Sequence, residues 1–277
     1  MPSNDLPLLI AEIDKLLTAI KPVVERLSGS QAYAADSLAS LFYRAAASKA
    51  FAAQQAILDL VRGGHAFAAQ TLLRPMVEEL ILVRYLNTLS LTDVEAYVYN
   101  QAVIEMVDGI EAQHRFRLRH SSAPASPGTA PLGEIKRARS GAQARLRDLG
   151  KRLGWKQGYV SPSIKQMAKD TDSLDLYNFF YHATSRSVHA SMHHLLRMVG
   201  FRPDKPGVTI STQNFADYYA AFSLIYGAWL LSLLLNDLAE RFPEMWSADE
   251  RLKIGMWLSS IAQWDWPLIV TAEETLI

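Results

Sequence analysis

The chain has 277 residues, of which 49% are hydrophobic and 20% are charged, and it contains no cysteine. This composition excludes disordered, collagen-like and coiled-coil classes. The lack of cysteine excludes disulfides, thiolate zinc sites, iron–sulfur clusters and a cysteine nucleophile. The N-terminal residues show no basic region followed by an apolar stretch, so no secretory signal is expected and a reducing, cytoplasmic location fits best.

Formal net charge is zero, with 28 basic and 28 acidic residues, but the charges are unevenly distributed. Between His114 and Lys156 there are eleven lysines and arginines against only Glu134 and Asp148, a net charge of +9. This segment is either a solvated face that pairs with acidic surface elsewhere, or a site for phosphates. Clustered basic side chains attract nucleic acid and displace its counterions, so RNA is the expected partner of residues 114–156 in the second case.

Apolar residues recur at helical spacing along the whole chain, and no alternating stretch is long enough to build a sheet. The sequence therefore predicts an all-α, multi-helix bundle that forms one domain over 1–277, with a core at 31–242 and a C-terminal helix at 247–264. In chain order the expected helices cover 8–27, 32–61, 66–89, 92–118, 132–153, a short helix from Ser161, 173–200, 214–241 and 247–264.

Glycine, proline and capping residues set the expected boundaries of these helices. Gly63 and Gly64 end the second helix, and Pro75 kinks the third. Thr92 with Glu95, and Ser247 with Glu250, have the spacing of capping boxes. Residues 120–133 are rich in serine, alanine, proline and glycine and are expected to form a mobile loop, while 201–212 should be a connection.

Residues 218–235 are 18 residues without a charge, at the lower bound for a membrane span. Tyrosines and serines are scattered through this run, and no cluster of lysine or arginine flanks it. A helix that is apolar all round is also what the centre of a large bundle requires. The sequence therefore favours a core helix and no membrane partner, with a membrane-associated helix as the alternative.

Arg74 and Glu78 lie four residues apart in a nearly apolar helix, so they share one face. A charge in such surroundings persists only when it is paired and hydrogen-bonded. Two interpretations stay open: a structural ion pair that sets helix register, or charged groups that line an internal pocket.

A second polar stretch follows Tyr181. If 173–200 is one helix, five basic or titratable residues fall within one stripe about 80° wide: His182, Arg186, His189, His193 and Arg197. A solvated face is one interpretation. A metal site is disfavoured because no carboxylate lies on that face and an arginine repels a cation, so no metal and no cofactor are expected. Anion chemistry suits the residues better, because arginine holds phosphate and neutral histidine transfers protons.

Two resemblances follow from these motifs. The Leu-Leu-Arg-x3-Glu helix of Arg74 and Glu78, with the later Tyr181-x3-Ser185-x3-His189 helix, resembles a bacterial all-helical family known only as a domain of unknown function. The likeness covers about 40–240 and implies the fold while saying little about activity.

The Arg-x6-His span from Arg186 to His193 is similar to the active-site motif of HEPN ribonucleases, which include toxins and phage-defence effectors. This resemblance implies metal-independent RNA cleavage, in which Arg186 positions the phosphate and His193 transfers a proton. It also implies a homodimer whose motif helices face each other. The alternative function is a non-catalytic helical module that senses a small anionic ligand or a protein partner.

Overall fold

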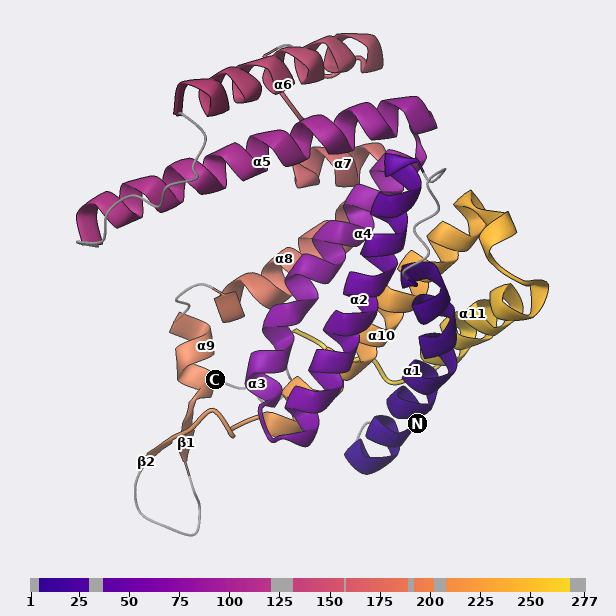
Figure 1. Cartoon of the computed structure of the whole chain (residues 1–277). Helices are drawn as coiled ribbons and strands as arrows, with labels where there is room; N and C mark the ends of the chain where they lie inside the picture. Colours follow the sequence, from indigo (N-terminus) through magenta and orange to yellow (C-terminus); the bar gives the residue numbers. More distant parts are fainter. Residues whose placement is uncertain are drawn as a thin grey trace. The chain divides into compact units, whose positions relative to one another are not determined.

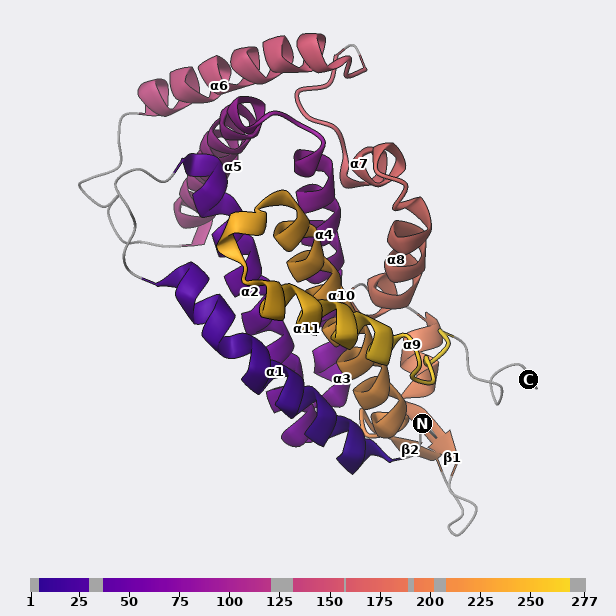
Figure 2. The same cartoon turned by 90° about the vertical axis from the view of Figure 1, so that its right-hand side faces the viewer.

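The structure is a computed structural model that describes residues 5–29, 37–120, 132–156, 158–188, 192–201 and 208–269, and most of these residues are helical (Figures 1 and 2). The predicted all-α class is confirmed. The contacts divide the chain into two compact units, one of 1–32, 43–87 and 167–277 and the other of 33–42 and 88–166. Residues 121–131 of the expected mobile loop lie outside the described residues.

The first unit contains most of the helices. Its elements are α1 (Leu6–Ser28), most of α2 (Leu38–Arg62), α3 (Ala66–Ala69), the 3₁₀ turn η1 (Gln70–Leu72), α4 (Leu73–Asn87), α8 (Leu174–Val188), α9 (Met192–Arg197), α10 (Ala216–Arg241), η2 (Pro243–Met245) and α11 (Ala248–Ile261). Strands β1 (Val199–Phe201) and β2 (Val208–Ile210) pair antiparallel, with Gly200 opposite Thr209, where the sequence predicted the end of a helix and a connection. The second unit is built on α5 (Leu91–His120) and α6 (Leu132–Leu153), and α7 (Ile164–Asp170) spans the boundary.

Helix α10 forms the centre of the first unit, where it packs against α1, α3, α4 and α11 (Figure 2). Within the described residues it is the one helix long and apolar enough to cross a membrane, but 83% of its most apolar 18-residue window is buried inside the fold. Burial on all sides requires apolar residues around the whole helix, so the packing accounts for its composition and supports the core-helix interpretation.

Several predicted boundaries are confirmed by their capping geometry. The Ser247 side chain accepts from the backbone N–H of Glu250, whose carboxylate accepts from the N–H of Ser247, which completes the capping box of α11. Gly64 ends α2 with a φ of 76°, and Gly154 ends α6 with a φ of 72°. Glycine tolerates this left-handed conformation because it has no Cβ.

Three local predictions are wrong. Helix α5 is capped by Ser90, whose Oγ accepts from the N–H of Asp93, so the cap lies two residues before Thr92. The helix expected at 66–89 is interrupted by η1 at Gln70–Leu72, upstream of Pro75, because proline has no N–H to donate to the carbonyl of Thr71. The single helix expected at 173–200 is instead two helices, since α8 ends at Val188 and α9 begins at Met192.

The segment after α11 is held on α10 by hydroxyl groups and aromatic rings. Tyr218 donates to the carbonyl oxygen of Leu268 at 2.6 Å, and Tyr226 donates to that of Pro267 at 3.0 Å. The indole of Trp266 packs edge-on against Tyr226, with ring centroids 5.0 Å apart. Residues 262–269 therefore cover part of the apolar surface of α10.

Candidate functional site

Helices α4 and α8 pack against each other in the first unit, and two arginines of α4 reach serines at the two ends of α8. The Nη1 group of Arg74 donates to Oγ of Ser185 at 3.2 Å, and Nη1 of Arg84 donates to Oγ of Ser173, also at 3.2 Å. The earlier arginine meets the later serine, so the helices run antiparallel. Because each bond joins a particular pair of residues, the two bonds together set the register of α8 on α4.

The Arg74 cluster joins four residues that the sequence singled out. Nε of Arg74 donates to Oε1 of Glu78 at 3.0 Å, and the guanidinium carbon lies 5.6 Å from the ring centroid of Tyr181. Together with the bond to Ser185, this brings Arg74, Glu78, Tyr181 and Ser185 into contact around one guanidinium group. The side chains of Arg74 and Glu78 are 26% and 39% exposed, so the pair is open to solvent on one side and can meet a ligand there.

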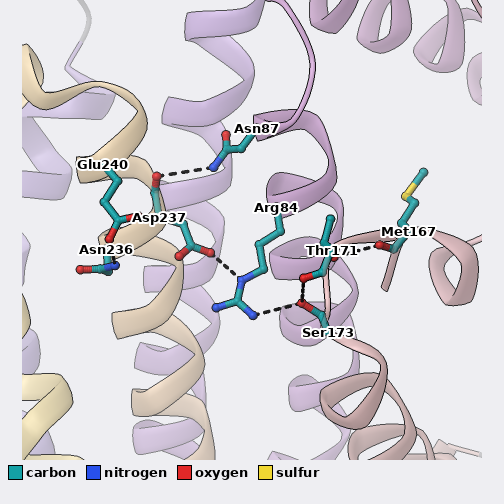
Figure 3. Close-up of polar contacts among 8 residues, drawn as sticks. All are labelled: Arg84, Asn87, Met167, Thr171, Ser173, Asn236, Asp237 and Glu240. Carbon is teal, nitrogen blue, oxygen red and sulfur yellow. Dashed lines mark hydrogen bonds and ion pairs between the residues drawn. The ribbon is translucent and has the colours of Figure 1, made fainter. Parts of the chain in front are cut away.

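The Arg84 cluster lies further along α4 and was not identified from the sequence (Figure 3). Nε of Arg84 donates to Oδ2 of Asp237 on α10 at 2.7 Å, while its Nη1 reaches Ser173. Asn87 donates through Nδ2 to the backbone carbonyl of Asp237 at 3.5 Å, and Ser173 donates to the carbonyl of Thr171 at 3.2 Å. One arginine thus connects α4, α8 and α10.

Burial raises the pKa of Asp237, and the hydrogen bond and positive charge of Arg84 act in the opposite direction. A carboxylate removed from water is stabilised only by such a partner, so the Arg84–Asp237 pair is a structural connection between α4 and α10. Two features of the sequence could have indicated this ion pair. Arg84 lies ten residues after Arg74 in the same apolar helix, and Asp237 carries a charge directly after the long uncharged run.

The predicted stripe of five basic residues does not form as expected, because α8 and α9 are separate helices. The side chain of His182 is exposed. That of Arg197 is buried, donates through Nη2 to the carbonyl oxygen of Ile269 at 2.7 Å, and lies 4.8 Å from the ring centroid of Tyr218. Arg197 therefore belongs to the interior between α9, α10 and the C-terminal segment.

The three candidate catalytic residues are Arg186, His189 and His193, and the structure does not describe their side chains. Arg186 is in the last turn of α8 and His193 is in the first turn of α9, but their side chains lie outside the described part of the chain. His189 lies outside it entirely. Among the described ranges no three His, Cys, Asp or Glu residues come together in a group that could hold a metal ion.

The basic segment contributes to a helical hairpin in the second unit. Helices α5 and α6 lie side by side along their length (Figure 1). Three arginines of α6 reach polar residues of α5 at three successive levels: Arg152 pairs with Asp93 at 2.9 Å, Arg145 Nε donates to Asn100 at 2.7 Å, and Arg139 pairs with Asp108 at 2.9 Å. Residue numbers rise on one helix as they fall on the other, so the hairpin is antiparallel. Three of the eleven bases therefore hold the two helices together.

A groove of about 500 Å³ lies between α5 and α6 near the ends that flank residues 121–131. Its lining residues are Glu111, His114, Arg115, Lys136, Arg139, Ser140 and Gln143. Next to it along α5, Phe116 is 65% exposed and its ring centroid lies 4.7 Å from that of His120. Arg115, Arg119 and Arg137 are exposed in the same stretches of the two helices. This end of the hairpin is rich in positive charge and carries an exposed aromatic ring.

The comparisons with known proteins concern the same helices. A family model described as a family of unknown function, DUF5677, matches residues 41–206, which is more than half of the chain. The chain belongs to the DUF5677 family. The resemblance to a bacterial domain of unknown function is thereby confirmed. No curated protein and no solved structure matches the chain, and nothing in the comparisons supports the HEPN resemblance.

The DUF5677 segment contains both helices of the Arg74 cluster and the whole α5–α6 hairpin. Helices α1, α10 and α11 lie outside it, so the matched segment is shorter than the expected span of 40–240. Asp237 therefore lies outside the DUF5677 match, while its partner Arg84 lies within it.

Proposed function

We propose that this DUF5677 protein binds RNA through the basic end of the α5–α6 hairpin. The observation that carries the proposal is the groove between these helices, where His114, Arg115 and Lys136 accompany the single acid Glu111. Positive charge along a groove attracts a phosphate backbone, and exposed aromatic rings such as Phe116 provide surfaces on which unpaired bases stack. The ladder formed by Arg139, Arg145 and Arg152 keeps the two helices in register, so the groove is built before RNA arrives.

The proposal extends to metal-independent cleavage of the bound RNA, as in a HEPN-type toxin or phage-defence ribonuclease. In that reaction a base takes the proton of a ribose 2′-hydroxyl, the oxygen attacks phosphorus, a cyclic phosphate forms, and the 5′-oxygen leaves with a proton. His193 transfers one of these protons and Arg186 stabilises the charge on the phosphate. What supports this assignment is the Arg74–Ser185 hydrogen bond, which anchors the turn of α8 directly before Arg186. A homodimer in the reducing cytoplasm completes the proposal.

RNA binding is tested by filter binding of single-stranded RNA at several salt concentrations. We expect an affinity that falls steeply with salt, and a slope of log affinity against log salt that decreases by about 0.7 for each phosphate contact removed. Arg115→Gln with Lys136→Gln should weaken binding and lower the slope. Lys15→Gln with Lys21→Gln on α1 removes the same charge from exposed positions and is the matched control. An affinity that is independent of salt, or equal loss in both double variants, contradicts the proposed footprint.

Cleavage is tested with labelled RNA in EDTA. His193→Ala should abolish cleavage while RNA binding stays nearly unchanged, because proton transfer accounts for about 10²- to 10⁴-fold in rate. His189→Ala is the comparison, since the two resemblances point to different histidines. If wild-type protein does not cleave RNA, or if His193→Ala cleaves as well as wild type, the nuclease part of the proposal is wrong.

The second candidate is a non-catalytic module that senses a small anionic ligand or a protein partner. The observation that favours it is the Arg74 cluster, in which a partly exposed guanidinium lies beside Tyr181, Ser185 and Glu78. In this case Arg74→Gln would remove ligand-induced thermal stabilisation by inorganic phosphate or a nucleotide. RNA binding at the hairpin would be unaffected, which separates the two candidates.

A further inference from the structure

Helix α9 has only six residues, and His193 lies in its first turn. A helix of this length is not stable by itself in water, so contacts with the rest of the fold must hold α9 in place. An apolar face does not supply them, because Met192, Leu195 and Leu196 are 75%, 50% and 67% exposed. Arg197 is 7% exposed and is the one buried residue among the α9 side chains that the structure describes.

The guanidinium group of Arg197 lies among three aromatic rings at the start of α10. Its carbon is 5.5, 4.8 and 5.9 Å from the ring centroids of Phe215, Tyr218 and Tyr219. At these distances the face of an aromatic ring attracts a cation. Arg197 therefore anchors the end of α9 on α10.

The segment after α11 is part of the same anchor. Three consecutive backbone carbonyls, those of residues 267–269, accept hydrogen bonds from Tyr226, Tyr218 and Arg197 at 3.0, 2.6 and 2.7 Å. Backbone carbonyls that leave water need such partners, so the three bonds stabilise the segment in this position. The bond from Arg197 connects the segment directly to α9.

The segment also has an anchor that is separate from α9. The ring of Trp266 packs edge-on against Tyr226 and Trp229, with centroids 5.0 Å apart in both pairs, and its Nε1 donates to the carbonyl oxygen of Ile261 at 3.1 Å. None of these contacts involves α9. A change at Trp266 therefore acts on α9 through the segment and not by direct contact.

We propose that residues 266–269 control the cleavage site by holding α9, with Arg197 as a positioning residue for His193. This inference rests on the proposed nuclease function. The Arg74–Ser185 bond holds the α8 half of the motif, and Arg197 holds the α9 half. His193 lies about one helical turn before Arg197, so a shift of this anchor moves His193 as well. Misplacement of a reacting group by 1 Å lowers a rate by about 100-fold, so docking of the segment favours cleavage.

Hydrogen exchange of the full chain, followed by mass spectrometry, tests whether the segment holds α9. The reporters are the N–H of Met198, which donates to the carbonyl of Leu195, and the N–H of Ser211, which donates to the carbonyl of Met198. In Trp266→Ala both should exchange about two- to tenfold faster, the factor that corresponds to the net loss of one hydrogen bond. Leu268→Ala is the matched control, since Leu268 is 70% exposed in the same segment and its variant should exchange like wild type.

A smaller change tests the same link at one atom. Tyr218→Phe removes the hydroxyl that donates to the segment and keeps the ring beside Arg197. It should also increase exchange at Met198 and Ser211. Tyr99→Phe on α5 is its control, because Tyr99 is 56% exposed and its variant should leave exchange at both reporters unchanged.

Cleavage of labelled RNA in EDTA tests the connection to function, under conditions in which circular dichroism shows each variant to be folded. Trp266→Ala and Tyr218→Phe should lower kcat about tenfold or more. KM and filter binding of RNA should stay nearly unchanged, because the proposed RNA-binding groove is lined by residues of α5 and α6. Arg197→Met should also lower kcat, and Arg197→Lys, which keeps a charged donor, should restore part of the loss.

Two results overturn the inference. Equal exchange in Trp266→Ala and Leu268→Ala means that the segment does not hold α9. Faster exchange with an unchanged kcat means that the position of α9 does not control cleavage. Failure of the proposed function gives a different pattern, in which wild-type protein cleaves no RNA although exchange at Met198 and Ser211 still responds to Trp266→Ala. That pattern overturns the nuclease function and, with it, the control of cleavage by the segment.

Discussion

Gly227 of α10 lies directly against side chains of α2. A Cβ added at this position would lie 2.0 Å from Oε1 of Gln54 and 3.0 Å from Cδ1 of Ile57. The Gln54 side chain is fully buried and donates through Nε2 to the carbonyl oxygen of Leu224 at 3.4 Å. Gly227→Ala should therefore displace a fully buried amide, and we expect the variant to be less stable than wild type.

The magnitude follows from three opposing contributions. Overpacking a closely packed interior costs about 1–3 kcal/mol. Leaving part of the Gln54 amide without a hydrogen bond costs about 1–3 kcal/mol more. Alanine favours a helix over glycine by about 1 kcal/mol. The net expectation for Gly227→Ala is a loss of about 1–5 kcal/mol in the free energy of unfolding.

Urea unfolding followed by circular dichroism measures this loss. Gly109→Ala is the matched control, because Gly109 is exposed within α5 and its added Cβ would meet no atom within 4 Å. That variant should gain about 0.5–1 kcal/mol from helix propensity. Gln54→Ala should recover part of the loss in the Gly227→Ala background but destabilise the wild type. If Gly227→Ala and Gly109→Ala have the same effect, α10 and α2 do not approach as closely at Gly227 as described.

Three further predictions concern contacts between distant segments. The hydrogen bond from Arg26 lowers the pKa of Glu250 from 4.5 to about 2. The ionised Glu250 carboxylate therefore stabilises the folded protein above pH 4.5, and this stabilisation is lost as pH falls toward 2. In Glu250→Gln the free energy of unfolding, measured with urea, should change less with pH over this range. Arg84→Met should lower the free energy of unfolding by about 2–4 kcal/mol at neutral pH, because it leaves the buried Asp237 carboxylate without its partner. The double variant Arg84→Met with Asp237→Leu should recover much of this loss, as measured by thermal unfolding. Trp266→Ala should lower the free energy of unfolding by about 2–4 kcal/mol and make the segment after α11 easier to cleave by proteases, because the indole anchors that segment on α10. Equal rates of proteolysis in the variant and the wild type would contradict this.

The sequence by itself determined the local structure. Helix α6 begins and ends at the predicted residues, Leu132 and Leu153, because the apolar period and the glycine that follows it act within a few residues. The Ser247–Glu250 capping box is likewise confirmed, since both partners lie in one turn. The wrong cap of α5 was also local: Ser90 and Thr92 are both suitable N-cap residues, and only the position at which the backbone turns into the helix distinguishes them.

The meeting of distant side chains was decided by the tertiary structure. The sequence singled out Arg74 and Ser185, which are 111 residues apart, but it did not predict that one would bind the other. It also did not predict that Arg84 pairs with Asp237, or that Arg139, Arg145 and Arg152 hold a hairpin instead of forming an uninterrupted basic face. Helical period, caps and turns depend on hydrogen bonds between near neighbours, and those are visible in a short stretch of sequence. Which faces meet depends on the packing register of whole helices, and a change of one residue in that register would give every one of these arginines a different partner.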